Sequence, residues 1–455
     1  MEKADDIMGT EKIGKLVLKL GFPAVVAQLI NVLYNMVDRM YIGHIPEEGA
    51  KALTGLGVCL PIIILISAFS AFVGMGGAPL ASIELGKGDR ERAEKIMGNG
   101  VTILLLFSVV LTVVFGIYKT PLLYMFGASD VTIEYANDYL NIYLIGTVFV
   151  QAALGLNMFI TSQGQARIAM FSVLIGAILN IILDPIFIFA AGMGVKGAAL
   201  ATIISQGVSA IWVVSFLLSE KSGLRIRLQN LKPDWKIIGS VAALGVSPFV
   251  MQSTESLINI VLNRGLQQYG GDLHVGALTI MQSVMQLIVI PVQGISQGTQ
   301  PIISYNYGAG KPERVKQTVK VVFCVIFAVT MIGCLATCLA PEVFAKLFTA
   351  EQDMIELVGE VMPIFLFGIG IFGIQMTCQS AFMGLGQAKI SLFLALLRKV
   401  LLLIPLALIL PHFFGVNGIY YAEPAADILS AVTAGILFLL SFKKIIGVYA
   451  KEEEG

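Results

Sequence analysis

Charged residues are scarce in this chain. Asp, Glu, Lys and Arg make up 13% of its 455 residues, against about a quarter in an average soluble domain. The 30 basic and 30 acidic residues give a formal net charge of zero. Overall charge therefore gives no support to a polyanionic partner such as nucleic acid. We interpret the basic stretch at 87–95 as a loop and not as a nucleic-acid patch.

Residues that bind metals or form disulfides are also few. The five cysteines are odd in number and lie in apolar stretches. Cys334 and Cys338 share a helix face, but no histidine or carboxylate lies near them in sequence, so small buried side chains are favoured over a metal pair. The three histidines, His44, His274 and His412, fall in outer loops or at a helix end. We expect none of them to bind a metal.

Signals for secretion and for nucleotide binding are missing as well. The stretch MEKADDIMGTEKIGK is polar and mixed in charge, which argues against a cleavable signal peptide. The segment ELGKGD lacks the upstream glycine and the Ser or Thr after Lys87 that a Walker A loop requires. No pore-loop repeat is found either. We therefore expect neither an enzyme, nor an ATP-driven pump, nor a channel, and we expect no cofactor.

Long apolar stretches are what the sequence has in abundance, since 56% of its residues are hydrophobic. About twelve stretches are long enough to cross a bilayer as a helix. The predicted fold is an all-α polytopic membrane protein with twelve transmembrane helices. The predicted spans are 15–42, 53–83, 96–118, 133–161, 168–190, 196–218, 238–268, 276–305, 317–340, 354–384, 390–411 and 416–441.

Basic residues are concentrated in alternate connections between these spans. The segments GKGDRERAEK, SEKSGLRIRLQNLKPDWK, GAGKPERVKQTVK and FKKIIGVYAK follow the second, sixth, eighth and twelfth spans. On the opposite side, the segments GHIPEEGAKALTG, GASDVTIEYAND, AGMGVKGA, YGGDLHVGA, TAEQDMIEL and FFGVNG together hold just Lys51 and Lys196. The positive-inside rule then predicts that both termini are cytoplasmic. We expect a multi-pass protein of the cell membrane.

The chain contains an internal repeat. LGKGDRERAEK near residue 86 matches YGAGKPERVKQ near residue 308, and SQGQARI (162–168) matches GLGQAKI (384–390), both at an offset of 222. This predicts two six-helix lobes, 1–218 and 237–455, joined by a cytoplasmic loop at 219–236. The lobes would be related by a pseudo-twofold axis along the membrane normal. Transporters of this design usually bind substrate between their halves and alternate access by rocking one against the other.

An acidic residue interrupts one of the most apolar stretches, ILNIILDPIFIF (178–189). A carboxylate at the centre of a span costs roughly 3 to more than 10 kcal/mol, which makes Asp184 a candidate functional residue. Asn180 lies one turn earlier on the same face, and Pro185 removes a backbone donor. Asp38 in the first span supplies a second carboxylate. With nearby amide and hydroxyl oxygens, this set suits a proton or a small cation such as Na⁺. Further polar candidates are Asn31, Tyr34 and Asn35 in the first span, and Thr202, Ser205 and Gln206 in the sixth.

The second repeat does not preserve the acidic pair. Asp38 aligns with Asn263, and at an offset of 221 Asp184 falls opposite Pro405. We infer that the first half carries the coupling ion.

Two segments carry a resemblance to a known family. GTEKIGKLVLKLGFPAVVAQLINVLYNMVDRMYIGHI and GISQGTQPIISYNYGAGKPERV resemble the multidrug and toxic compound extrusion (MATE) family, and the chain is most similar to its MepA-like bacterial members from about Gly9 to about Lys444. The resemblance implies twelve helices in two lobes, a central cleft, and efflux of organic cations in exchange for H⁺ or Na⁺. It also implies a cation site in the first lobe, here Asp38, Asn180, Asp184 and Thr202. Some relatives use further acids on the seventh and tenth helices. This chain has Glu255 in the seventh span, but the acids of its tenth span lie near the outer end, which argues against a second-lobe ion site.

Candidate substrate residues are harder to choose. Glutamines recur along the eighth span with methionines beside them, and flexible methionines suit a promiscuous site. Alternatively, the glutamines bond between helices and the methionines fill gaps. Glu255 either attracts a cationic drug or pairs with Arg264 or Arg398, and Arg398 either pairs with Asp427 or has a functional role. The cleft candidates are Tyr34, Asn35, Ser205, Gln206, Glu255, Met281, Gln282, Met285, Gln286 and Gln293.

Two function classes remain. One is an antiporter for organic cations or drugs, working as a monomer in contact with membrane lipid, without nucleic acid or ATP. The other is a flippase or exporter of a lipid-linked or other amphipathic metabolite. A flippase cavity needs several cations to hold phosphates, whereas the central spans offer acids and amides.

Overall fold

The structure is a computed structural model that describes residues 7–452, and within that range every regular element is a helix. Among the described residues, ten helices are long and apolar enough to cross a membrane, and the total is twelve if each of two bent pairs is one span. These correspond one by one to the twelve predicted spans, so the predicted fold class is confirmed.

The elements are as follows. The first half has α2 (Ile13–Gly43), α3 (Gly49–Gly86), α4 (Arg90–Met125), α5 (Ile133–Ile145), α6 (Thr147–Gln151), the π-helical η1 (Ala152–Leu156), α7 (Asn157–Ser162), α8 (Ala166–Pro185), the π-helical η2 (Ile186–Ala190), α9 (Val195–Leu218) and the 3₁₀ turn η3 (Leu228–Leu231). The second half has α10 (Trp235–Gly270), α11 (Asp272–Gly308), α12 (Pro312–Leu339), α13 (Pro341–Lys346), α14 (Gln352–Phe365), α15 (Ile369–Gly384), α16 (Ala388–Leu396), the π-helical η4 (Leu397–Leu403), α17 (Ile404–Ile409), α18 (Pro411–Phe414) and α19 (Val416–Glu452).

Two spans are broken in the middle. The fourth bends by 62° between α5 and α6, at Gly146, and the tenth bends by 45° between α14 and α15. Other spans are interrupted by π-helical turns, which often occur at functional sites. In the fifth span, η2 begins directly after Pro185, whose missing N–H cannot continue the regular α-helical ladder.

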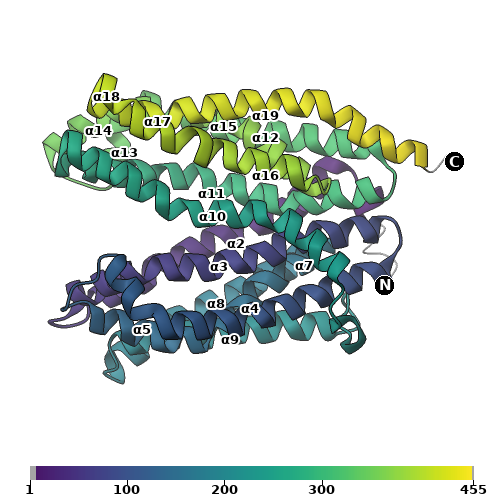
Figure 1. Ribbon diagram of the computed structural model, residues 1–455, viewed down its shortest axis with the longest axis horizontal. Helices are drawn as coiled ribbons and strands as arrows, with labels where there is room; N and C mark the ends of the chain where they lie inside the picture. Colours follow the sequence, from purple (N-terminus) through teal and green to yellow (C-terminus); the bar gives the residue numbers. More distant parts are fainter. Residues whose placement is uncertain (1–6, 453–455) are drawn as a thin grey trace. The chain divides into compact units, whose positions relative to one another are not determined.

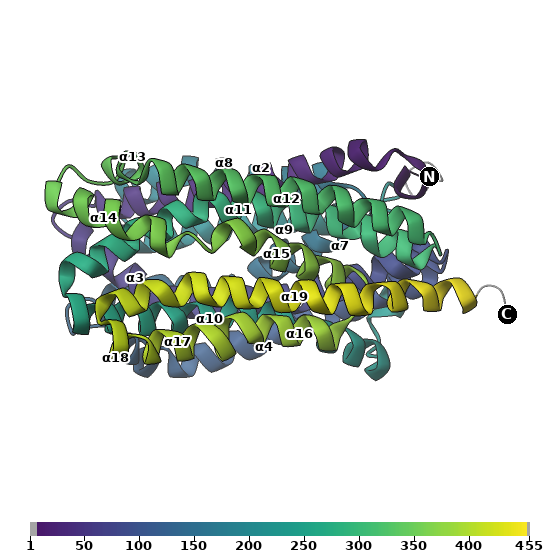
Figure 2. The same ribbon diagram turned by 90° about the horizontal axis from the view of Figure 1, so that it is seen from above.

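The chain forms two compact units whose boundaries differ from the predicted ones. Unit 1 comprises the described residues up to Thr10 together with Val26–Gln252, and unit 2 comprises Glu11–Val25 and the described residues from Ser253 onward. The sequence placed the division in the 219–236 loop. Instead, α2 and α10, the first long helices of the two repeats, each contribute to both units. Within unit 2, Figure 1 shows α11, α12 and α15 as neighbouring helices, and Figure 2 shows α19 beside α17.

Close backbone contacts explain why the early part of α10 belongs to unit 1. A Cβ atom on Gly245 would lie 2.1 Å from the carbonyl oxygen of Phe72, and one on Gly76 would lie 2.5 Å from that of Val241. Both contacts join α3 to α10, and both require the absence of a side chain. In unit 2, the early part of α2 meets α11 in the same way, because a Cβ atom on Gly298 would lie 2.4 Å from the carbonyl oxygen of Leu20.

This packing gives a stability prediction. Gly245→Ala should lower the thermal unfolding midpoint of the detergent-solubilised protein by several degrees, since overpacking costs about 1–3 kcal/mol. Gly239→Ala on the same helix is the matched control, because a Cβ atom there meets nothing within 4 Å. The control should be neutral or slightly stabilising, as alanine is the better helix former. Equal midpoints for the two variants would contradict this account of α10.

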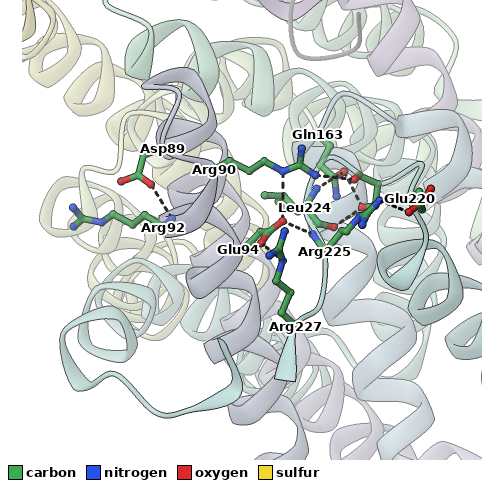
Figure 3. Close-up of polar contacts among 10 residues, drawn as sticks. Asp89, Arg90, Arg92, Glu94, Gln163, Glu220, Leu224, Arg225 and Arg227 are labelled. Atoms are coloured by element: carbon green, nitrogen blue, oxygen red, sulfur yellow. Dashed lines mark hydrogen bonds and ion pairs between the residues drawn. The ribbon is translucent and has the colours of Figure 1, made fainter. Parts of the chain in front are cut away.

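The connection before α10 is bound along its length to unit 1. Ser222 Oγ and the Leu224 N–H both donate to Gln163 Oε1 at 3.1 Å. Glu94, which is buried, accepts from the Arg225 N–H at 3.3 Å and pairs with Arg227 at 2.8 Å. Figure 3 shows Glu94 among these partners. The 219–236 segment is therefore a fixed part of unit 1 and not a boundary between the units.

Candidate functional site

The predicted acidic pair is brought together within unit 1. Asp38 is on α2, in the part belonging to unit 1, and Asp184 is at the end of α8. Their carboxyl groups are in direct side-chain contact, and Asn180 Nδ2 donates to Asp184 Oδ1 at 3.2 Å. Asp184 is 0% exposed and Asp38 is 7% exposed. Two acids in contact at this depth cannot both be ionised cheaply, because their charges repel each other in a medium of low dielectric constant.

Several oxygens at this site lack a protein partner. Among the described residues, no hydrogen bond reaches Asp38 Oδ1, Asp184 Oδ2, Asn180 Oδ1 or Ser205 Oγ, and all four atoms are buried. Buried polar atoms are nearly always paired with protein, water or an ion. Carboxylate, amide and hydroxyl oxygens can bind a proton, and they also coordinate hard cations such as Na⁺. The donor set therefore fits the predicted coupling ion.

A small cavity lies next to Asn180, the residue that donates to Asp184. It measures about 30 Å³, which is room for one or two waters or an ion and is far below a drug-sized site. The cavity is lined by Asn31, Tyr34, Ala153, Leu154, Ser172, Val173, Gly176, Ala177, Asn180, Thr202, Ser205, Gln206 and Ser209.

This geometry separates the first-half candidates into two groups. Of the four residues of the predicted cation site, Asn180 and Thr202 line the cavity, whereas Asp38 and Asp184 do not. Tyr34, Ser205 and Gln206, chosen as substrate candidates, line the same ion-sized space. Asn35 does not line the cavity, but its exposed side chain donates to the backbone oxygen of Asn31 at 2.6 Å and interacts with Tyr34, and both of these residues do line it.

Tyr139 on α5 is a neighbour that the sequence prediction missed. Its buried side chain contacts Thr202 and lies near Asp38, and its ring stacks on Tyr143 with centroids 5.9 Å apart. A tyrosine pair at i and i+4 in an apolar span was the signal in the sequence, because both hydroxyls then point to the same helix face.

The candidates on α11 do not form one surface. Met281 is fully buried in the core, and Met285 is half-buried. Gln282 Nε2 donates to Asn259 Oδ1 at 2.8 Å, an interhelical bond of the kind the alternative interpretation proposed. Gln286 and Gln293 are exposed.

Glu255 pairs with a residue other than those predicted. Its carboxylate bonds to Lys399 Nζ, and neither Arg264 nor Arg398 was the right choice. The predicted pair of Arg398 with Asp427 is confirmed at 2.7 Å, and Arg398 also pairs with Glu423 at 2.7 Å. The π-helical turn η4 carries both basic residues and directs one towards each set of acids.

Twelve spans built as a repeat, with a buried acidic pair and an ion-sized cavity next to Asn180, define a helical membrane transporter. The chain belongs to the MatE family, whose model matches residues 23–186 and 248–409. These two segments begin 225 residues apart and correspond to the two halves of the predicted repeat, since 248 − 23 = 225.

Individual relatives are more distant. The chain is 25% identical to the multidrug export protein MepA of Staphylococcus haemolyticus over 93% of its own length and 92% of that protein's. It superposes on a crystal structure of a MATE protein in a bent conformation with a TM-score of 0.91, at 23% identity over 98% of this chain and 99% of that one. A MOP superfamily transporter from Pyrococcus furiosus, described as having a binding pocket of reversed polarity that suggests a different function, matches with a TM-score of 0.89, at 22% identity over 96% of this chain and 98% of that one. At this level of identity the two structures establish the fold alone.

Proposed function

We propose that this protein is a multidrug efflux antiporter that exports organic cations and drugs across the cell membrane in exchange for H⁺ or Na⁺ by alternating access. The observation that carries the proposal is the contact between Asp38 and Asp184, with unpaired oxygens beside an ion-sized cavity. A proton or Na⁺ relieves the repulsion between the two acids, so ion occupancy stabilises one arrangement of α2, α8 and α9 over another. A differential affinity of this kind is what couples an ion gradient to transport.

Membership of the MatE family and similarity to the multidrug export protein MepA support the same proposal. We also propose that both termini are cytoplasmic, because the positive-inside rule assigns the connections rich in Lys and Arg to the cytoplasm. The protein would act as a monomer and need no cofactor beyond the coupling cation.

A flippase for a lipid-linked or other amphipathic metabolite is supported less well. It would need free cations in the spans to hold phosphate groups. The two basic residues of the eleventh span, Arg398 and Lys399, are instead engaged with carboxylates.

The test is transport in reconstituted vesicles. Full-length protein is placed in liposomes with ethidium as a fluorescent organic cation, and a pH gradient or a Na⁺ gradient is imposed separately. One of the two gradients should drive uphill movement of the dye, and an ionophore that dissipates this gradient should stop it. ATP should have no effect while the gradient is clamped.

Two results would overturn the proposal. Dye movement that requires ATP under a clamped gradient would indicate a pump. Movement of a lipid-linked phosphate without any gradient-driven cation transport would favour the flippase.

A further inference from the structure

The connection between α9 and α10 follows the side of α4 for about two helical turns. The N–H of Arg225 and the guanidinium group of Arg227 both contact Glu94, at 3.3 Å and 2.8 Å. Farther along α4, Thr102 Oγ1 donates to the backbone oxygen of Leu231 at 2.7 Å. Glu94 and Thr102 lie about 12 Å apart along the helix axis, because each residue of a helix adds about 1.5 Å. The connection therefore reaches from the end of α4 into its predicted membrane span.

Arginine side chains gather where the connection meets Glu94. Arg90 and Arg227 are directed towards this buried carboxylate and pair with it at 3.4 Å and 2.8 Å (Figure 3). Among the described residues, the Arg225 guanidinium group pairs with Glu220 alone, at 3.6 Å, and that partner is 92% exposed. An exposed ion pair of this kind contributes little. Arg225 Nε is also buried without a hydrogen-bond partner in the part of the chain that the structure describes. The Arg225 side chain therefore has donors for another acceptor.

The charge of the connection favours an anion. Residues 219–236 include five basic and two acidic residues. One of these acids, Asp234, already accepts at Oδ1 from the backbone N–H groups of Lys236 and Ile237, at 2.9 Å and 3.4 Å. The other is the exposed Glu220. The acids of the connection therefore leave most of its positive charge available to a ligand.

Two large apolar side chains of the connection are exposed at the deeper level. Leu228 begins η3 and is 86% exposed, and Trp235 begins α10 and is 80% exposed. Next to Trp235, the N–H of Asp234 donates to Asn99 Oδ1 at 2.7 Å. Asn99 lies inside the predicted span 96–118, so this part of the connection is at the level of the membrane boundary. Tryptophan is enriched at that boundary, where one side of its ring system contacts acyl chains.

We propose that Arg225, Arg227, Leu228 and Trp235 form a binding surface for an anionic phospholipid. The guanidinium groups donate to the phosphate group, which matches their planar, bidentate geometry, and the acyl chains lie against Leu228 and Trp235. Basic groups near the end of α4 and apolar groups farther along its span follow the order of a phospholipid and not that of a soluble anion. Because α10 begins at Trp235 and contributes to both units, the lipid holds the end of a helix that the units share.

Quenching of tryptophan fluorescence by brominated lipids tests this proposal. The chain has two tryptophans, so Trp212→Phe leaves Trp235 as the sole reporter. The full chain carrying this change is placed in phosphatidylcholine vesicles that contain a minor fraction of either brominated phosphatidylglycerol or brominated phosphatidylcholine. The relative association constant from the quenching of Trp235 should favour phosphatidylglycerol about tenfold or more, since each basic residue near an anionic lipid contributes about fivefold.

Arg225→Gln in the same background should lower this preference about fivefold. The Arg225 N–H that donates to Glu94 belongs to the backbone and is retained, so the connection should stay folded. Lys316→Gln is the matched control. It also removes one positive charge, at the position of the second repeat that aligns with Glu94, since 316 − 94 = 222, and Lys316 pairs with Glu313. This control should keep the full preference.

The reverse reporter locates the effect on the protein. Trp235→Phe leaves Trp212, which is 40% exposed on α9, and this variant should be quenched alike by the two lipids. A preference of Trp212 as large as that of Trp235, or an equal loss in Lys316→Gln and Arg225→Gln, would reduce the effect to general attraction and overturn the proposal.

Two further results would contradict the lipid surface even if no charge variant folds. One is equal quenching of Trp235 by the two brominated lipids. The other is loss of the preference when inorganic phosphate is added at constant ionic strength, which would assign the arginines to a soluble anion. The proposal is independent of the coupling ion and of the exported compound, so failure of the transport test in vesicles leaves it standing.

Discussion

Asp184→Asn should abolish gradient-driven uphill export, lowering its rate by about 100-fold or more, while the protein still folds. Asparagine resembles the protonated acid in shape and charge, so the site remains in one of its two occupancy states. The structure explains why folding should survive: the side-chain oxygen that accepts from Asn180 at 3.2 Å is present in both residues. Export in liposomes under the driving gradient measures the effect.

Two controls separate coupling from folding in this variant. Binding of tetraphenylphosphonium and exchange of dye without any gradient should persist, because neither step requires the site to change occupancy. We place the resulting rearrangement at the junction of α8 and η2, where Pro185 already interrupts the backbone ladder. Export at the wild-type rate would show that Asp184 is a structural carboxylate.

The twelve spans could be predicted because a bilayer imposes a minimum apolar length on each helix. The breaks within them could not. Hydropathy does not report the direction of the backbone, and the 62° bend at Gly146 and the 45° bend before Ile369 occur inside stretches of uniform apolarity. The division into units was missed for a similar reason. Gly76 and Gly245 permit a close helix contact, but in the sequence they resemble any other glycine of a membrane helix.

In the candidate site, too, some residues could be predicted from the sequence and others could not. Asp38 and Asp184 stood out because a carboxylate in an apolar span is costly and because the second repeat lacks both acids. The partner of Glu255, in contrast, could not be identified from the sequence. Consecutive residues of an α-helix point about 100° apart, so the sequence could not tell whether Arg398 or Lys399 faces α10, and η4 changes that angular relation. Tyr139 was missed because its contact with Thr202 joins α5 to α9, and these two residues are 63 positions apart in sequence.

The asymmetry between the halves gives the second large expected effect. Asp38→Asn should reduce uphill export about as strongly as Asp184→Asn, because it also leaves a single acid where two are in contact. Asn263→Ala changes the aligned position of the second repeat and should reduce export by less than about threefold. The structure strengthens this contrast, since Asp38 is 7% exposed and Asn263 is exposed.

The comparison must be made at equal amounts of folded protein in the membrane, because polar side chains between helices also support assembly. The rate of ethidium export per folded molecule is the quantity to compare, with binding of tetraphenylphosphonium measured on the same preparations. If Asp38 holds the coupling ion, Asp38→Asn retains binding while it loses export, and Asn263→Ala retains both. Equal loss of export in the two variants would mean that the duplicated position serves only structure. The coupling ion would then have to be sought in unit 2, where the remaining buried acids lie next to Arg398 and Lys399.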